Sequence, residues 1–303
     1  MEKYRQFAHQ ATGVNPFIPP GINAKLSLFY LRAVLLSPLF AIRLLVLFSV
    51  ALPTLAVFDK LPVRSIRAAL VSLMSLISLK LLGFSTQSSE PDYKKLRMMN
   101  PVKTGNPGHV IISQYQSPCD VLVLGWSVAP ESFGFPASDG KIEALGIFWA
   151  FLQAGMSQPL TGTLSVSEFF ESKKFSVLFP EGCRTNGTGV LSWDKSLREE
   201  ISRYSIMNKL GTVAIAYNTD TPYSAHLAPG GNFMIWLWGL GLSLRHTVKI
   251  SRLSASKVDD PRALFVRLCN SIRKEGSVDT DLSCVNASEF AKYWNKTRVT
   301  KYL

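Results

Sequence analysis

A long apolar tract near the start of the chain limits what the protein can fold into more than any other feature. Residues 26–58, LSLFYLRAVLLSPLFAIRLLVLFSVALPTLAVF, contain two charged side chains, Arg32 and Arg43, and two prolines, Pro38 and Pro53. One membrane-spanning helix needs about 20 residues and two need about 40 plus a turn, so the tract is long for one span and short for two. We therefore expect a membrane-embedded kinked hairpin or a tilted span.

The charges around the tract suit a membrane surface. Arg32 and Arg43 lie 11 positions apart, which places both on nearly the same helical face, where they can extend toward lipid headgroups. Basic residues also flank both ends: Lys3, Arg5 and Lys25 before the tract, and Lys60, Arg64 and Arg67 after it. This symmetry is expected if both ends stay cytosolic. An ordinary transmembrane helix near residues 44–58 and a buried core helix remain alternatives.

The segment after the tract is predicted to form an amphipathic helix that ends near Gly83. Its apolar residues recur at helical spacing: Ile66, Leu70, Leu73, Ile77 and Leu81. Such a helix can pack on the globular domain or lie on the membrane, and we expect a mixture of the two. Further along, residues 233–244 are twelve uncharged residues, too few to span a bilayer, which suit a core element or an interfacial patch.

The remainder of the chain is predicted to be an α/β domain, because short apolar segments typical of buried strands alternate with helical segments. The predicted strands are 109–113, 131–137, 176–180, 212–217 and 246–253, and the predicted helices are 119–128, 143–155, 165–173 and 195–209. This alternation favours a largely parallel central sheet flanked by helices. The expected organisation is a cytosolic N-terminal segment (1–25), a membrane-embedded hairpin or span plus an amphipathic helix (26–84), and the α/β domain (85–303).

The net charge and the cysteine spacing indicate which binding partners, metal sites and cellular location to expect. The chain has 33 Lys and Arg against 21 Asp and Glu, a formal charge of +12, which points to an anionic partner. The basic residues are scattered around apolar helices without an aromatic-interleaved motif, so we expect no nucleic-acid binding. The four cysteines show neither metal-site spacing nor a disulfide framework, so we expect no metal site and a reduced, cytosol-facing location.

A candidate phosphate-binding loop follows the predicted strand 176–180. Its sequence, FPEGCRTNG at 179–187, combines glycines with an arginine. Backbone N–H groups and a guanidinium can together bind phosphate, and Glu181 could hold Arg184 at a fixed angle. From spacing alone, a structural turn with one salt bridge is an equal alternative.

A second block, SQYQSPCD at 113–120, follows another predicted strand, and Glu181 lies 61 positions after its Asp120. Together the two blocks resemble the NHxSxxD and FPEGTRS motifs of the glycerolipid acyltransferases, the family of lysophosphatidate and glycerol-phosphate acyltransferases. The matching residues are Ser117, Pro118 and Asp120, then Phe179, Pro180, Glu181, Gly182 and Arg184. The resemblance covers roughly residues 80–255, and it is nearest to fungal lysophosphatidic acid:oleoyl-CoA acyltransferases with a degenerate first motif.

This resemblance implies acyl transfer from an acyl-CoA co-substrate to the hydroxyl of lysophosphatidic acid or another lysophospholipid, with no bound cofactor. In the family, the histidine of the first motif removes the hydroxyl proton and the aspartate orients it. Here the histidine position is Tyr115, and no HxxxxD occurs in the chain. We therefore expect Asp120 as base or base-holder and Tyr115 as its polar partner. The residues expected to bind the acceptor and its phosphate are Glu181, Gly182, Arg184, Ser117 and Thr185.

Three further expectations follow. Cys119 has two alternative interpretations. Its thiolate could attack the thioester and form an acyl-enzyme, or its side chain could simply fill an apolar position. The family resemblance implies a place at the endoplasmic reticulum membrane and the lipid droplet, with the catalytic domain facing the cytosol, in phospholipid and triacylglycerol synthesis. The alternative function is an inactive scaffold that binds lipid or acyl-CoA in membrane traffic or lipid droplet organisation. Loss of the histidine favours the scaffold, whereas retention of Asp120 together with the whole FPEGCR block at 179–184 favours the enzyme.

Overall fold

The protein is built around a seven-stranded sheet, seen in a computed structural model that describes residues 2–18, 26–88, 110–156, 160–172, 174–207, 210–218, 224–242, 246–255, 260–273 and 277–302. The strand order is β1-β8-β7-β2-β5-β3-β4. The strands are β1 (Phe84–Ser88), β2 (Val110–Ser113), β3 (Ser132–Pro136), β4 (Ile142–Leu145), β5 (Ser176–Leu178), β7 (Leu210–Tyr217) and β8 (His246–Ala255). A small second sheet pairs β6 (Gly189–Val190) with β9 (Val278–Asp279).

The central sheet is largely parallel, which confirms the predicted fold class. The pairs β1/β8, β7/β2, β2/β5 and β5/β3 are parallel, whereas β7/β8 and β3/β4 are antiparallel. Strand β2 lies between β5 and β7, with Val110 opposite Ser176 and Ile111 opposite Gly211. Because β2, β5 and β7 run in one direction, the segments that follow them emerge at the same edge of the sheet, where α/β proteins place their binding sites.

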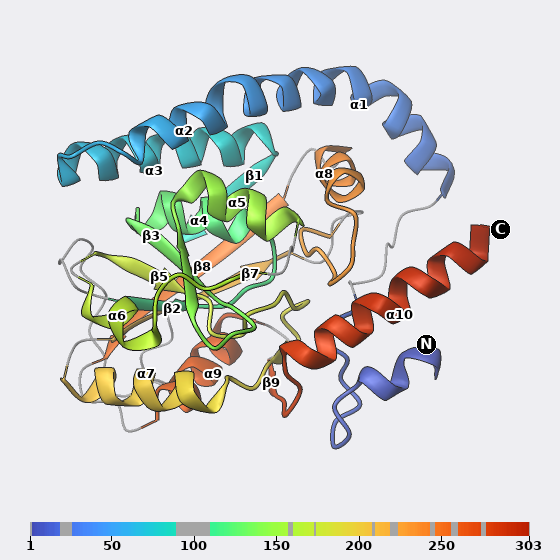
Figure 1. Ribbon diagram of the computed structural model, residues 1–303. Coiled ribbons are helices and arrows are strands. Elements are labelled where there is room, and N and C mark those ends of the chain that lie inside the picture. The colour runs from blue at the N-terminus through green and yellow to red at the C-terminus, as the bar shows by residue number, and fades with distance from the viewer. Residues whose placement is uncertain are drawn as a thin grey trace.

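Helices cover both faces of this sheet (Figure 1). One face carries α3 (Arg64–Leu81), α4 (Cys119–Ser127) and α5 (Ile147–Met156), and the other carries α6 (Val166–Glu171), α7 (Lys195–Met207) and α9 (Pro261–Ile272). The side chains of β2 alternate between the two cores, with Ile111 in one and Val110 and Ile112 in the other. This two-sided burial explains why β2 is an uninterrupted apolar run in the sequence.

The predicted helix over residues 143–155 is wrong at its start. Residues Ile142–Leu145 form the edge strand β4, which pairs with β3 through a tight turn in which the Ala137 N–H donates to the Lys141 carbonyl at 2.9 Å. Gly140 supplies the positive φ of +75° that this turn requires. A short apolar run does not by itself separate a strand from a helix, and here the helix α5 begins only at Ile147.

The apolar tract forms one continuous helical rod. It comprises α1 (Leu26–Val46), a π-helical turn (Leu47–Ala51) and α2 (Leu52–Phe58), and it lies along α3, α5 and α8 (Phe233–Leu242) (Figure 1). Pro53 lacks the N–H that would continue the α-helical ladder, and the π turn ends two residues before it, at Ala51. The chain reverses at residues 59–63, after the tract and not within it. Residues Val34–Phe58 are long and apolar enough to cross a membrane by length and composition alone.

Helix α3 turns its apolar stripe away from the protein. Ile66, Leu73 and Ile77 are 55%, 53% and 39% exposed, whereas the opposite face is buried. The buried residues are Arg67, Val71, Ser75, Ser78 and Leu79. The small side chains on this face let α3 approach α4 closely, because a Cβ added at Gly125 would lie 2.6 Å from Ser75 Oγ. The predicted helix is confirmed, and its exposed stripe continues the apolar surface of α1 and α2.

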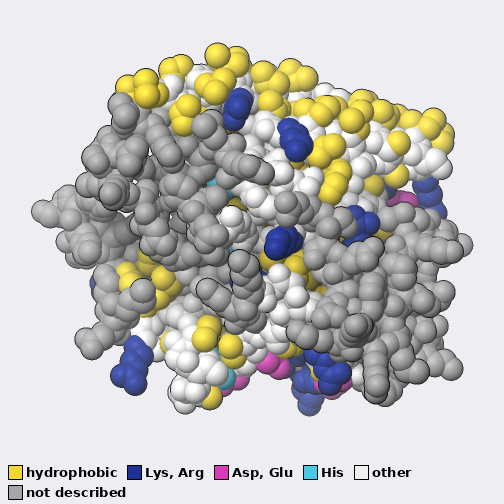
Figure 2. Space-filling view, turned by 180° about the vertical axis from the view of Figure 1, so that it is seen from behind, with side chains coloured by type: hydrophobic (Ala, Val, Ile, Leu, Met, Phe, Trp, Pro, Cys, Tyr) yellow, Lys and Arg dark blue, Asp and Glu magenta, His cyan; other side chains and the backbone are white. Residues whose placement is uncertain are grey.

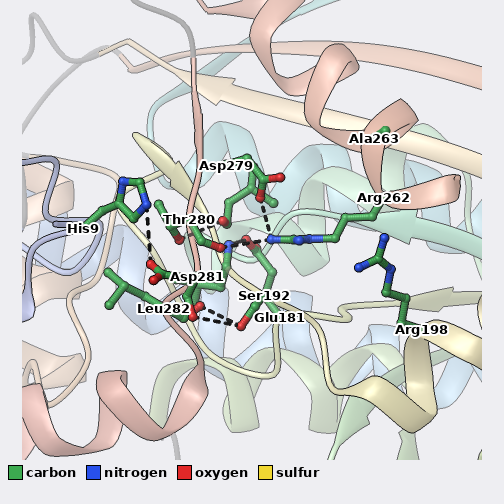
Figure 3. A network of polar contacts seen from close by, with 12 residues as sticks. His9, Glu181, Ser192, Arg198, Arg262, Ala263, Asp279, Thr280, Asp281 and Leu282 are labelled. Atoms are coloured by element: carbon green, nitrogen blue, oxygen red, sulfur yellow. Dashed lines mark hydrogen bonds and ion pairs between the residues drawn. The ribbon is translucent and has the colours of Figure 1, made fainter. Parts of the chain in front are cut away.

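The N-terminal arm packs against the C-terminal helix. The 3₁₀ helix η1 (Glu2–Phe7) and the residues after it share an aromatic cluster with α10 (Cys284–Tyr302), in which Phe7 and Phe17 contact Phe290. Polar contacts tie the same region together: His9 Nε2 lies 3.4 Å from Asp281 Oδ1, and Arg262 forms an ion pair with Asp279 (Figure 3). The arm, β9, α9 and α10 therefore pack together beside the loop that follows β5.

Candidate active site

Three chain segments converge at the carboxyl edge of the sheet: the turn after β2, the loop after β5 and the end of β7. Their meeting point is Asp120 in the first turn of α4, whose side chain is fully buried. Asp120 Oδ2 accepts hydrogen bonds from the backbone N–H groups of Gln116 at 2.6 Å and Ser117 at 2.8 Å. Asp120 Oδ1 accepts one from the Tyr217 hydroxyl at 2.5 Å. These three neutral donors hold the carboxylate in one orientation.

The environment of Asp120 raises the pKa of its carboxyl group well above the usual value. Burial raises the pKa of Asp120 to about 7, and the hydrogen bonds from Tyr217, Gln116 and Ser117 counteract part of that rise. Within the described part of the chain, Asp120 forms no ion pair. A general base acts best when its pKa lies near the working pH, so Asp120 has the acidity for proton transfer.

Tyr115 occupies the expected histidine position but does not donate to Asp120. Its backbone N–H donates to Glu181 Oε2 at 3.2 Å, and its carbonyl accepts from the Thr185 N–H at 2.9 Å. The ring packs in an aromatic cluster, 5.0 Å from the Phe179 ring centre. Burial raises the pKa of Tyr115, so its phenol stays protonated and neutral. The hydroxyl partner of Asp120 is thus Tyr217, and a catalytic role of Tyr115 stays a prediction.

Glu181 links the two loops instead of orienting Arg184. Its Oε1 accepts from the Leu191 N–H at 2.9 Å and its Oε2 accepts from the Tyr115 N–H. Burial raises the pKa of Glu181 to about 7, and the nearby charge of Asp120 adds to that rise. The Glu181–Arg184 contact considered from the sequence does not form, because each side chain has other partners.

The Arg184 guanidinium is buried against backbone carbonyls. Its NH1 group donates to the carbonyls of Ala154 at 2.5 Å and Gly155 at 3.2 Å, and its NH2 group donates to the Ala228 carbonyl at 3.4 Å. The Ala154 and Gly155 carbonyls lie at the C-terminal end of α5, which favours a cation, and the Ala228 carbonyl lies in the segment before α8. Burial lowers the pKa of Arg184. Arg184 therefore fixes the loop against α5.

The other predicted site residues support these loops. Gly182 has φ +67°, a conformation that favours glycine. Ser117 Oγ accepts from the Cys119 N–H at 3.1 Å, a local serine turn just before α4. Thr185 Oγ1 accepts from the Gly187 N–H at 3.2 Å. The Cys119 side chain is fully buried and burial raises its pKa, so it lacks the thiolate that an acyl-enzyme route needs.

A histidine that the sequence motifs do not include, His226, contacts two of the residues that bind Asp120. Arg273 donates to Gln116 Oε1 at 2.6 Å. Because arginine can only donate, this Gln116 atom is the amide oxygen, which can only accept. His226 Nε2, 3.1 Å from the same oxygen, therefore donates to it. Ser224 Oγ lies 2.9 Å from the other ring nitrogen, Nδ1, to which it donates. Burial lowers the pKa of His226 to about 3, so the ring is neutral with its proton on Nε2.

His226 contacts the supports of Asp120 on both sides. It bonds the side chain of Gln116, whose backbone N–H binds Asp120, and its ring packs edge-on against Tyr217 at 5.5 Å. Sequence reasoning missed both residues because Tyr217 lies 97 positions from Asp120 and His226 lies 110 from Gln116. One signal was present: Tyr217 is a polar residue at the end of a predicted buried strand.

Comparisons with known proteins give limited information. No protein-family model matches the chain, and no curated protein matches it. Among solved structures, the chain is similar to the crystal structure of the 1-acyl-sn-glycerophosphate (LPA) acyltransferase PlsC from Thermotoga maritima. The identity is 18%, the TM-score is 0.43, and the match covers 77% of this chain and 88% of the other. At these values the likeness does not assign a function, which has to be argued from the site itself.

Proposed function

We propose that the protein is a membrane-bound acyltransferase that transfers the acyl group of an acyl-CoA to the free hydroxyl of lysophosphatidic acid, forming phosphatidic acid. The observation that carries this proposal is the state of Asp120. A fully buried carboxylate that is held by neutral donors, with a pKa near 7, is costly for folding. Such a group at the carboxyl edge of a parallel sheet is the arrangement expected of a general base.

The proposed reaction is a direct attack of the acceptor on the thioester. Asp120 Oδ1 accepts one bond, from Tyr217, and its second lone pair can accept the acceptor hydroxyl. Asp120 takes the hydroxyl proton while the oxygen bonds to the thioester carbonyl carbon. The carbon–sulfur bond then breaks, and Asp120 returns the proton to the sulfur of coenzyme A. Tyr115, which keeps its phenolic proton, can donate to the oxyanion of the intermediate.

The loop after β5 is the proposed phosphate-binding element. Three carbonyls do not use all five N–H donors of the Arg184 guanidinium, so the remaining donors can bind phosphate oxygens. Glu181 and Thr185 hold this loop against Tyr115, which keeps the phosphate site and the base at a fixed separation. Positioning of this kind can supply several kcal/mol of the barrier.

An exposed apolar surface is proposed to dock the enzyme on the membrane that holds its lipid substrates. It runs along α1, α2 and α3 (Figure 2) and continues onto α5 and α8 through Trp149, Ile235 and Trp238, which are 62%, 65% and 41% exposed. Large exposed apolar patches mark membrane or partner contacts, and tryptophans favour the lipid interface. We propose a cytosol-facing location on the endoplasmic reticulum or a lipid droplet, which the four free cysteines support.

The proposal is tested by incubating the purified full chain in phosphatidylcholine vesicles with labelled oleoyl-CoA and lysophosphatidic acid. We expect phosphatidic acid and free coenzyme A in equal amounts, and loss of both in Asp120→Asn. Asp139→Asn is the matched control, because Asp139 is exposed and lies in the turn between β3 and β4. If wild type shows no turnover above empty vesicles yet still binds oleoyl-CoA, the scaffold alternative replaces this proposal.

A further inference from the structure

Two of the four thiols lie together beside the proposed phosphate loop. Cys183 is in that loop between Gly182 and Arg184, and Cys284 is the first residue of α10. The two thiols are hydrogen-bonded to each other. The backbones are also close, since a Cβ added at Gly182 would lie 3.8 Å from Cys284 Sγ and 3.9 Å from Cys284 Cβ. Residues 101 positions apart in sequence are therefore neighbours at the loop.

The two thiols differ in exposure and in acidity. Cys284 is exposed and sits at the N-terminal end of a 19-residue helix, where free N–H groups favour a thiolate. The hydrogen bond from Cys183 lowers the pKa of Cys284, and the same bond, with burial, raises the pKa of Cys183. An exposed, acidic thiol next to a second thiol is the usual arrangement of a redox-sensitive cysteine and its resolving partner.

The remaining thiols provide an internal comparison. Cys119 and Cys269 are fully buried, and burial raises the pKa of both. Neither offers the thiolate or the access that oxidants and alkylating reagents require. Reactivity in the folded chain should therefore be confined to the pair at the loop.

We propose that Cys284 and Cys183 form a thiol modification site, at which a hydroperoxide oxidises Cys284 and Cys183 resolves the product as a disulfide. The Cys284 thiolate bonds to one peroxide oxygen, the oxygen–oxygen bond breaks, and the leaving oxygen takes a proton from water. This leaves Cys284 as a sulfenic acid. The Cys183 sulfur then bonds to Cys284 Sγ, the sulfur–oxygen bond breaks, and the hydroxide that leaves takes the Cys183 proton and departs as water. A dithiol such as dithiothreitol returns both thiols.

The disulfide would act on the loop through its immediate neighbours. It would join the backbone beside Gly182 and Arg184 to α10, which the N-terminal arm already holds through Phe290. The loop could then no longer shift independently of α10, and Arg184 would be held more firmly against α5. We therefore expect reversible loss of acyl transfer on oxidation, a consequence that rests on the proposed function, whereas the thiol chemistry does not.

The test treats the full-length protein with a few equivalents of hydrogen peroxide, alkylates the remaining thiols and maps peptides without reduction. We expect a linked Cys183–Cys284 peptide that dithiothreitol releases, while Cys119 and Cys269 alkylate only after denaturation. Cys284→Ser should remove the link, and Cys183→Ser should leave a sulfenic acid on Cys284 that dimedone traps. Cys269→Ser, the matched control, should behave as wild type. Before oxidation, iodoacetamide should modify Cys284 at least about tenfold faster than the two buried thiols.

The proposal is overturned if Cys284 stays reduced, if it proceeds to sulfinic or sulfonic acid in wild type without forming the link, or if it links to another cysteine. Turnover measured on the same samples separates the two proposals. A linked peptide without any acyl transfer in reduced wild type refutes the proposed function alone. Acyl transfer in a protein that never forms the link refutes the thiol site alone.

Discussion

Replacement of Tyr217 by phenylalanine removes one hydroxyl group and should move the pH dependence of the reaction. The Tyr217 hydroxyl donates to Asp120 Oδ1 at 2.5 Å, and it is the strongest of the influences that lower the pKa of Asp120 from its burial-raised value. Its loss leaves the ionised carboxylate with the hydrogen bonds from the Gln116 and Ser117 N–H groups and the more distant charge of Arg273. The pKa of Asp120 should therefore rise further above about 7.

The size of the shift follows from the strength of the bond. A hydrogen bond to a charged group contributes about 1.5–3 kcal/mol, and one pKa unit corresponds to about 1.4 kcal/mol, so we expect a rise of about one unit or somewhat more. With a wild-type pKa of about 7, half of Asp120 is ionised at pH 7. A rise of about one unit lowers that fraction to about one tenth, so turnover at pH 7 should fall about fivefold and recover near pH 9.

The assay is the pH profile of kcat for phosphatidic acid formation between pH 5.5 and 9.5, in vesicles of constant composition. Tyr204→Phe is the matched control, because Tyr204 is a buried tyrosine in the core on the other face of the sheet and should leave the acid limb in place. Tyr115→Phe can lower the rate but should also leave that limb in place, since Tyr115 does not donate to Asp120. An unshifted limb in Tyr217→Phe, or an equal shift in Tyr204→Phe, would refute the reasoning.

Three further predictions follow from the same contacts. His226→Leu should lower kcat and shift the acid limb of the pH profile upward, because it removes the donor to Gln116. His226→Gln, which keeps an N–H donor, should restore both kcat and the acid limb. Equal pH profiles for wild type and His226→Leu would contradict this role. Asp120→Asn should unfold at higher temperature than wild type, with a difference that grows from about pH 4 to about pH 7 and then levels off, because burial raises the folded pKa of Asp120. A difference that shrinks over that range would contradict the burial cost. Replacing Trp149 and Trp238 together by serine should weaken vesicle binding about tenfold or more, measured by flotation, while Lys195→Ser on the opposite face should not.

The sequence could predict those helices and strands whose local residue pattern is compatible with only one type of secondary structure. The strands β2, β5 and β7 were predicted because each is a buried apolar run between polar segments. The periodicity of α3 likewise defined its apolar stripe, but periodicity does not say whether a stripe faces protein or lipid. The structure shows that the stripe faces outward, because Arg67 on the other face bonds Asp59 at 3.1 Å and two buried carbonyls.

The site was predictable only where its residues adjoin one another in sequence. Asp120 and Glu181 were expected from the two motif blocks, and both lie at the carboxyl edge of the sheet with raised pKa values. The hydrogen-bond partners were not predictable, because Tyr217 reaches Asp120 through the pairing of β2 with β7, and His226 reaches Gln116 from the segment after β7. Arg184 was expected to face an anion, whereas its contacts with three carbonyls depend on where α5 ends.

The central claim is that Asp120 is the base that activates a lysophosphatidic acid hydroxyl. Its most direct test is the formation of phosphatidic acid from lysophosphatidic acid and oleoyl-CoA by wild type and Asp120→Asn, followed across pH. The account predicts wild-type turnover with an acid limb near pH 7, and a loss of about a hundredfold or more in Asp120→Asn above pH 8, where the wild-type carboxylate is ionised. Equal turnover in the two proteins, or a wild-type rate that stays constant from pH 5.5 to 8, would contradict it.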